Sequence, residues 1–266
     1  MKRIVLSLIV LSSILFGANA TVYERMLVKA LNVGDLSKAQ KMIDKGADVN
    51  AEVYGEYGSD YLSDNLKTMP YKTFKFLIDH GIKKNKNTHM YTIFTDSIGF
   101  SAGYSDDGVD VYQKTKYLVD NKIGITALDT GTYGGNNIAL SYMLENKNPN
   151  QDFIKAFEYF IKHMSKKDLN KFGKKHWKGY AEKTVSKVKN VKLLKILVDN
   201  GLKLNEQWRY LYDGSKYPLD TAVEMKNLDL VKYMIRKGAK VTNSAIEMAQ
   251  KYRLDDIELY LVEHQK

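Results

Sequence analysis

The apolar positions of this chain recur every three or four residues along most of its length, which is the spacing of one face of an α-helix. Proline, which ends helices, occurs only three times. No stretch has the composition of a linker between domains. From residue 21 to residue 266 we therefore expect a single all-α domain.

The first twenty residues follow a different pattern. Lys2 and Arg3 precede an apolar run over residues 4–16, and the small residues Ala18 and Ala20 follow it. This order of features is typical of a cleavable secretory signal, so we expect residues 1–20 to be removed and Thr21 to be the mature N-terminus. The alternative is a retained anchor, but spanning a bilayer takes about 20 apolar residues. We expect a periplasmic or secreted protein without stable membrane insertion after cleavage.

One sequence pattern, called the phrase below, occurs six times along the chain. An apolar helical segment ends in a charged or polar residue, then glycine, then an apolar residue. Four copies keep the glycine (39–50, 74–81, 194–201 and 230–241), and two lack it (116–122 and 157–164). The glycine or its equivalent falls at positions 46, 81, 122, 164, 201 and 238. Glycine adopts the left-handed conformation that closes a helix, so each copy predicts a helix end.

A helix pair of this length cannot bury its apolar face alone, and neighbouring pairs must stack. The copies resemble the ankyrin-repeat family. In that family the repeat opens with T-P-L-H-x-A, and residues 217–222 keep its Pro218, Leu219 and Ala222. Residues 46–50, Gly-Ala-Asp-Val-Asn, are similar to the end of such a repeat. An unrelated stack of helix pairs is the alternative.

The resemblance implies an ankyrin-repeat solenoid of about six to seven helix pairs over residues 21–266, with hairpin or loop fingers between pairs. The third and fourth repeats carry insertions. A final pair, over 245–251 and 254–263, is expected to close the stack with a polar outer side. The residues of that side are Asp255, Asp256, Glu258 and Glu263.

Catalytic and metal chemistry finds little support in the sequence. The chain has no cysteine, which excludes a lipoprotein signal, disulfides and thiolate catalysis. His80 and His163 occupy the same place in their repeats, where a side chain interacts with the end of the helix dipole. The loop at 106–110 lacks the ligand order of a calcium-binding loop, and 131–135 is no phosphate-binding loop. We expect no enzyme, no metal and no cofactor.

The positive charge of the chain is concentrated in one segment. Without Lys2 and Arg3, 39 basic and 31 acidic residues leave a net charge of +8. Residues 162–192 hold eleven lysines and two acids. Lys174, Lys175 and Lys178 lie off the apolar face of that segment. They form either a solvated surface or a site for an anionic partner, for which an acidic protein suits an exported chain better than nucleic acid.

Aromatic residues gather in the segments between repeats. Tyrosine and tryptophan beside glycine and serine are typical of binding loops, because they give a large contact area at low entropic cost. The rings either contact a partner or pack against neighbouring fingers. As partner-binding candidates we name Tyr54, Tyr57, Tyr104, Tyr133, Trp208, Tyr210 and Tyr212, together with the three lysines.

These features favour an exported protein-binding module that is monomeric. The most specific version is an immunity-type inhibitor of a toxin or hydrolase that acts in the envelope. One alternative is an accessory factor to a periplasmic enzyme, in oxidative-stress defence or cofactor delivery. The other is an enzyme whose site lies in the inserted middle repeats.

Overall fold

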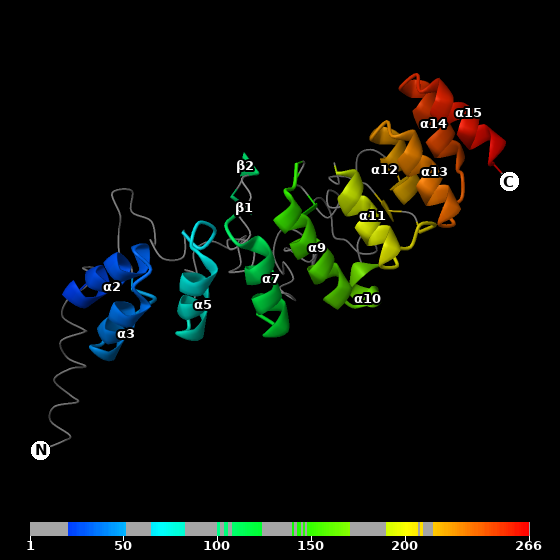
Figure 1. The fold of residues 1–266 in the computed structure, drawn as a ribbon. Helices are drawn as coiled ribbons and strands as arrows, with labels where there is room; N and C mark the ends of the chain where they lie inside the picture. Colours follow the sequence, from blue (N-terminus) through cyan, green and yellow to red (C-terminus); the bar gives the residue numbers. More distant parts are fainter. Residues whose placement is uncertain are drawn as a thin grey trace, which may run out of the picture. The chain divides into compact units, whose positions relative to one another are not determined.

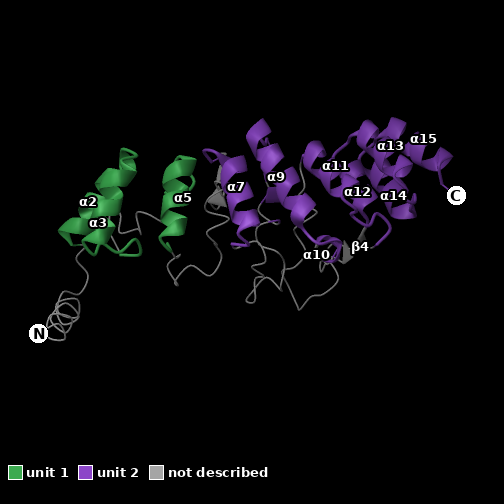
Figure 2. Ribbon diagram, turned by 60° about the horizontal axis from the view of Figure 1, so that its bottom comes forward, with its two compact units in different colours: residues 1–88 green, residues 89–266 purple. Residues whose placement is uncertain are grey.

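The computed structural model describes residues 21–51, 65–82, 108–123, 148–170, 190–206 and 215–265, and shorter pieces at 100–101, 104–105, 140, 143–144, 146 and 208–209. The chain divides into two compact units, residues 1–88 and 89–266, which Figure 2 colours green and purple. Each unit is taken by itself below.

The first unit contains a helix pair and one further helix. Helices α2 (Val22–Asn32) and α3 (Leu36–Asp44) pack against each other, and α5 (Tyr71–Asp79) follows. Thr21 caps α2 in a capping box, because its hydroxyl accepts from the amide of Glu24 while its own backbone nitrogen donates to the Glu24 carboxylate. Thr21, which we expect to be the mature N-terminus, is thus the N-cap of the first helix that the structure describes.

The second unit holds the remaining described elements. Its helices are α7 (Val111–Asp120), α9 (Gln151–His163), α10 (Lys166–Leu169), α11 (Val191–Asp199), α12 (Pro218–Glu224), α13 (Leu228–Arg236), α14 (Asn243–Lys251) and α15 (Asp255–Glu263). Two antiparallel hairpins join β1 (Phe100–Ser101) to β2 (Tyr104–Ser105) and β3 (Trp208–Arg209) to β4 (Ser215–Lys216). The prediction of a mainly helical protein is confirmed.

The helices that belong to the copies of the repeated phrase form a row in the second unit (Figure 1). Helix α7 packs on α9, α9 on α11, α11 on α13 and α13 on α15. We call these, with α3 and α5, the second helices. In a second layer α12 packs on α14, and each of the two also packs on the second helix that follows it. Apolar residues on the inner side of the second helices are buried, among them Leu77, Leu118, Phe160, Leu197 and Met234.

The predicted left-handed helix ends are present at five of the six positions. Gly46, Gly81, Gly201 and Gly238 have φ between +80° and +98°, and Lys122 takes the same region at +57°. At Gly201 the pattern is that of a Schellman motif: Leu202 N donates to Leu197 O at 3.0 Å and Gly201 N to Val198 O at 3.1 Å. The apolar residue after each of these four glycines is buried.

The prediction was wrong at position 164. Met164 ends α9 with φ −79° and ψ 140°, which is extended backbone. After one further residue, Ser165, the short helix α10 begins at Lys166. A left-handed residue would turn the chain back over α9, whereas an extended one lets it continue directly into α10.

The closing helix pair is less polar than the sequence suggested. Asp255, Asp256 and Glu263 are exposed as expected, while Glu258 is half-buried. On the same helix, however, Leu259 is 61% exposed and Val262 is 51% exposed. Among the helices that the structure describes, none is long and apolar enough to cross a membrane.

Candidate binding surface

Most of the predicted partner-binding residues lie outside the described residues: Tyr54, Tyr57, Tyr133, Lys174, Lys175, Lys178, Tyr210 and Tyr212. The backbones of the other two are placed. Tyr104 lies in β2, in register with Ser101, and Trp208 lies in β3, in register with Lys216. Both residues therefore belong to short antiparallel hairpins that precede a helix of the stack, which is where fingers were expected.

The hairpin that contains Trp208 is anchored at both ends. Before it, the Asn205 side chain donates to Gly238 O at 2.9 Å, and its Oδ1 accepts from Lys240 N at 2.8 Å. After it, the Asp220 carboxylate accepts from Tyr217 N at 2.8 Å and caps α12. Asp220 also accepts from the Ser244 hydroxyl of the next pair at 3.1 Å. The described residues on both sides of this hairpin are thus held by hydrogen bonds to the helix pairs that follow.

The Asn205 bridge is a repeated device that the sequence reasoning missed. Asn170 donates to Gly201 O at 3.0 Å and accepts from Lys203 N at 2.8 Å, and Asn50 donates to Gly81 O at 3.1 Å. Each asparagine thus joins its own repeat to the turn that ends the next second helix. The signal was present, because an asparagine follows the glycine by four residues at both Asn50 and Asn205.

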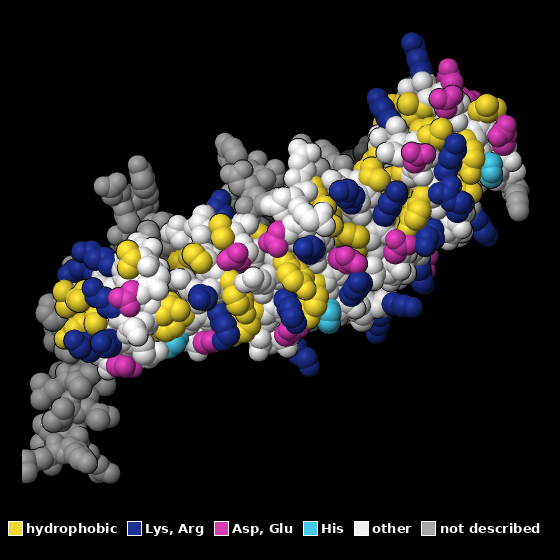
Figure 3. Space-filling view, viewed as in Figure 1, with side chains coloured by type: hydrophobic (Ala, Val, Ile, Leu, Met, Phe, Trp, Pro, Cys, Tyr) yellow, Lys and Arg dark blue, Asp and Glu magenta, His cyan; other side chains and the backbone are white. Residues whose placement is uncertain are grey.

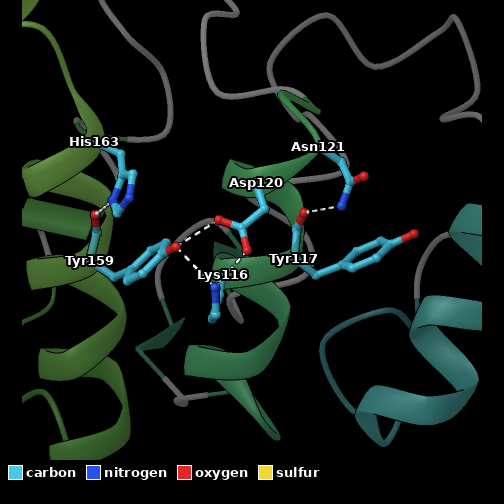
Figure 4. A network of polar contacts seen from close by, with 6 residues as sticks. All are labelled: Lys116, Tyr117, Asp120, Asn121, Tyr159 and His163. Atoms are coloured by element: carbon cyan, nitrogen blue, oxygen red, sulfur yellow. Dashed lines mark hydrogen bonds and ion pairs between the residues drawn. The ribbon is translucent and has the colours of Figure 1, made fainter.

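A polar network joins the outer sides of α7 and α9 (Figure 4). The Tyr159 hydroxyl donates to Asp120 Oδ1 at 2.6 Å, and Lys116 Nζ donates to Asp120 Oδ2 at 2.6 Å and to the Tyr159 oxygen at 3.1 Å. The bonds from Lys116 and Tyr159 hold the pKa of Asp120 below its usual value, and the same contacts raise the pKa of Lys116. The Lys116 ammonium lies 4.9 Å from the centre of the Tyr159 ring.

The same arrangement recurs between α11 and α13. The Tyr233 hydroxyl donates to Asp199 Oδ1 at 2.5 Å, and Lys237 Nζ lies 2.8 Å from the same oxygen. These two bonds lower the pKa of Asp199, while burial and the bond to Asp199 raise the pKa of Tyr233. Lys195 lies over the Tyr233 ring at 5.2 Å. At these two joints, between α7 and α9 and between α11 and α13, lysine, tyrosine and aspartate thus connect neighbouring repeats.

Three histidines lie among the described residues, and two of them, His80 and His163, are at the helix ends where they were expected. His80 and His163 lie at helix C-termini, where Nδ1 bonds to the carbonyl four residues earlier, at 2.7 and 2.8 Å. His264 does the same at 2.8 Å. Each imidazole also packs on the aromatic ring four residues earlier, with ring centres 4.0 to 4.1 Å apart. Asn121 and Asn200 replace histidine with an amide that donates to the equivalent carbonyl.

Helix α7 contains a buried lysine. Lys114 is 0% exposed, at a place that other second helices fill with Ala156, Leu193 or Leu230. Burial lowers the pKa of Lys114 to about 8, against the raising effect of the Asp110 carboxylate. The neighbouring Thr115 hydroxyl is buried with no hydrogen-bond partner. In the part of the chain that is described, no group of three histidines and carboxylates could hold a metal ion.

The comparisons with known proteins leave this arrangement as the main evidence about function. No protein-family model matches the chain, and no curated protein matches it either.

Proposed function

We propose that this chain is an exported ankyrin-repeat protein that binds another protein through its inter-repeat hairpins. The observation that carries the proposal is the hairpin before α12, whose flanking residues Asn205 and Asp220 are both fixed by hydrogen bonds to the next repeat. Such anchoring reduces the entropy lost when a loop binds a partner.

The ankyrin assignment is supported by what the repeats share in detail. A left-handed glycine ends the second helix, the following apolar residue is buried, and an asparagine four residues after Gly201 bridges to the next turn. Pro218 occupies the first turn of α12, where its fixed φ favours helix initiation. Together these features resemble the repeat phrase that suggested the family.

The partner's chemistry follows from the residues that the hairpins and the basic segment carry. Trp208, Tyr210 and Tyr212 would supply the central contacts, and Lys174, Lys175 and Lys178 would favour an acidic partner. A neutralising inhibitor of an envelope-acting toxin or hydrolase fits these requirements, since it must bind tightly in the compartment that the leader specifies. The immunity-type role is thus the most specific form of the proposal.

Site-specific crosslinking in the cell envelope tests the proposal. A photo-crosslinking amino acid replaces Trp208 in β3 or Tyr104 in β2, and as a matched control it replaces Lys155, which is exposed on α9. We expect the hairpin positions to capture one defined protein and the α9 position to capture none. Equal capture at all three positions, or no capture at the hairpins, would contradict the proposal.

A further inference from the structure

Among the residues that the structure describes, the large exposed apolar side chains lie mostly in the first and in the last helix pair along the sequence. Of the seven large hydrophobic residues that are exposed in the described part of the chain, three belong to α2 or its C-cap, one is the C-cap of α14, and two belong to α15. The six are Val22, Tyr23, Val33, Tyr252, Leu259 and Val262. On the inner second helices of the second unit, the residue at the place of Val262 is buried or half-buried, whereas the residue at the place of Leu259 is a lysine or a glutamate.

Helix α15 has residues like those through which inner second helices contact the next helix. Val262 stands two residues before the capping side chain His264, as Val119 and Val198 stand two residues before Asn121 and Asn200. Those two valines are 6% and 8% exposed because α9 and α13 cover them, whereas Val262 is 51% exposed. The outer side of α15 therefore has the shape of an inner joint without its covering helix.

The charge on this side of α15 also lacks its complement. Glu263 directly precedes the cap, in the place of Asp120 and Asp199, the carboxylates that accept a tyrosine hydroxyl from the next helix. Asp120 pairs with Lys116 four residues earlier on its own helix, but α15 has Leu259 at that place. Within the described chain neither Glu263 nor Asp256 forms an ion pair.

The outer side of α3 carries the opposite charge at matching places. Lys41 and Lys45 are four residues apart at the end of α3, as Tyr233 and Lys237 are at the end of α13. Tyr233 and Lys237 are the residues that both bind Asp199. One turn before Lys41 lies Lys38, and all three lysines are exposed. Figure 3 shows dark blue basic side chains crowded over α2 and α3.

We propose that copies of this chain associate head to tail, with α3 of one copy packed on α15 of the next in the register of the inner joints. Lys41 and Lys45 then flank Glu263, as Tyr233 and Lys237 flank Asp199. Two turns earlier, seven residues before Lys45 and before Glu263, Lys38 comes level with Asp256, and the lysine stems cover Leu259 and Val262. Because the two surfaces differ, the contact leaves one free end of each kind and can be repeated. This replaces the expectation of a monomer and does not depend on the proposed function.

Sedimentation velocity on the exported chain tests the proposal. We compare the wild type with two variants, Glu263→Lys and the double variant Lys41→Glu/Lys45→Glu. Because all three residues are exposed, circular dichroism should show unchanged folding. The control is Lys155→Glu, which reverses an exposed charge on α9 away from both ends.

The wild type and the control should form species that grow with protein concentration and shrink with added salt. Each end variant alone should associate about tenfold more weakly or worse, because like charges then face each other. An equimolar mixture of the two variants should associate again, since each carries the charge that the other's altered end requires. A wild type that stays monomeric at every concentration overturns the proposal. So does association that the variants leave unchanged, or a mixture that stays dissociated.

Discussion

Tyr233 donates its phenolic hydrogen to Asp199 Oδ1 across 2.5 Å, and the two residues lie 34 positions apart on successive second helices. Tyr159 and Asp120 form the same bond at 2.6 Å over a separation of 39. A contact that recurs at the period of the repeat links one helix pair to the next. The stack is therefore held by polar joints on its outer side as well as by its apolar core.

Removing one of these hydroxyls should lower stability without changing the fold. We expect Tyr233→Phe to reduce the free energy of unfolding by about 1 kcal/mol, because it removes a hydrogen bond to a charged acceptor at a half-buried site. Tyr260→Phe is the matched control: Tyr260 holds the same place on α15, but the preceding helix has Arg236 where α11 has Asp199. Urea unfolding measures both, and equal losses would mean that the bond to Asp199 contributes nothing.

The left-handed helix ends give a second prediction. Gly201→Val should destabilise the protein by about 1 to 3 kcal/mol, because a β-branched residue is strained at φ +98°. A Cβ there would lie 3.6 Å from Lys166 Cε, an ordinary contact, so the strain comes from the backbone and not from a clash.

The converse change is Lys122→Gly, at a residue already held at φ +57°. It should raise the free energy of unfolding by roughly 1 kcal/mol. Thermal unfolding of both variants, compared with the wild type, tests both predictions. An unaltered melting temperature for Gly201→Val would show that the left-handed conformation is not required.

The buried Lys114 should make stability depend on pH. Its pKa is about 8 in the folded chain, against an ordinary value of 10.5. Between pH 8 and pH 10.5 the unfolded state therefore binds more protons than the folded state. The free energy of unfolding should therefore rise as the pH is raised from about 8 to 10.5, and this gain should be lost again as the pH falls to 8 and below. We expect the wild type to gain up to about 3 kcal/mol from pH 7 to pH 10 relative to Lys114→Met. Urea titrations at the two pH values test this, and parallel behaviour of the two proteins would refute a depressed pKa.

The capping contact between Thr21 and Glu24 bears on a prediction about processing. If cleavage follows Ala20, the Thr21 nitrogen that donates to Glu24 becomes a charged amino group, and the contact becomes an ion pair. Mass spectrometry of the protein from the envelope fraction should find Thr21 as the first residue. A membrane-bound protein that still begins with Met1 would contradict the assigned signal.

The helix ends could be predicted from the sequence because their cause is local. Glycine at position 201 or 238 marks a left-handed cap wherever the chain folds, since only glycine adopts it without strain. The two copies without glycine carry no residue whose backbone preference decides the conformation, so Lys122 takes the left-handed one and Met164 does not.

The joints between repeats could not be predicted in the same way. Asn205 and Tyr233 bond to residues of a neighbouring repeat, so their partners depend on how helices stack and not on local preference. The partly apolar side of α15 was missed for the same reason, because the exposure of Leu259 depends on how neighbouring helices pack and not on local preference. Tyr104 and Trp208 were found because they are aromatic residues of the segments between repeats, and the family resemblance implied hairpins or loops in those segments.

The central claim, that hairpin aromatics bind a protein partner, is tested most directly by the dissociation rate of the Trp208→Ala variant. Surface plasmon resonance against the crosslinked partner should show dissociation about thirtyfold faster at every salt concentration, as expected for a central residue of an interface, with unchanged circular dichroism. Neutralising Lys174, Lys175 and Lys178 should instead slow association at low salt only. If Trp208→Ala unfolds the protein or leaves the dissociation rate unchanged, the hairpin is not the binding site.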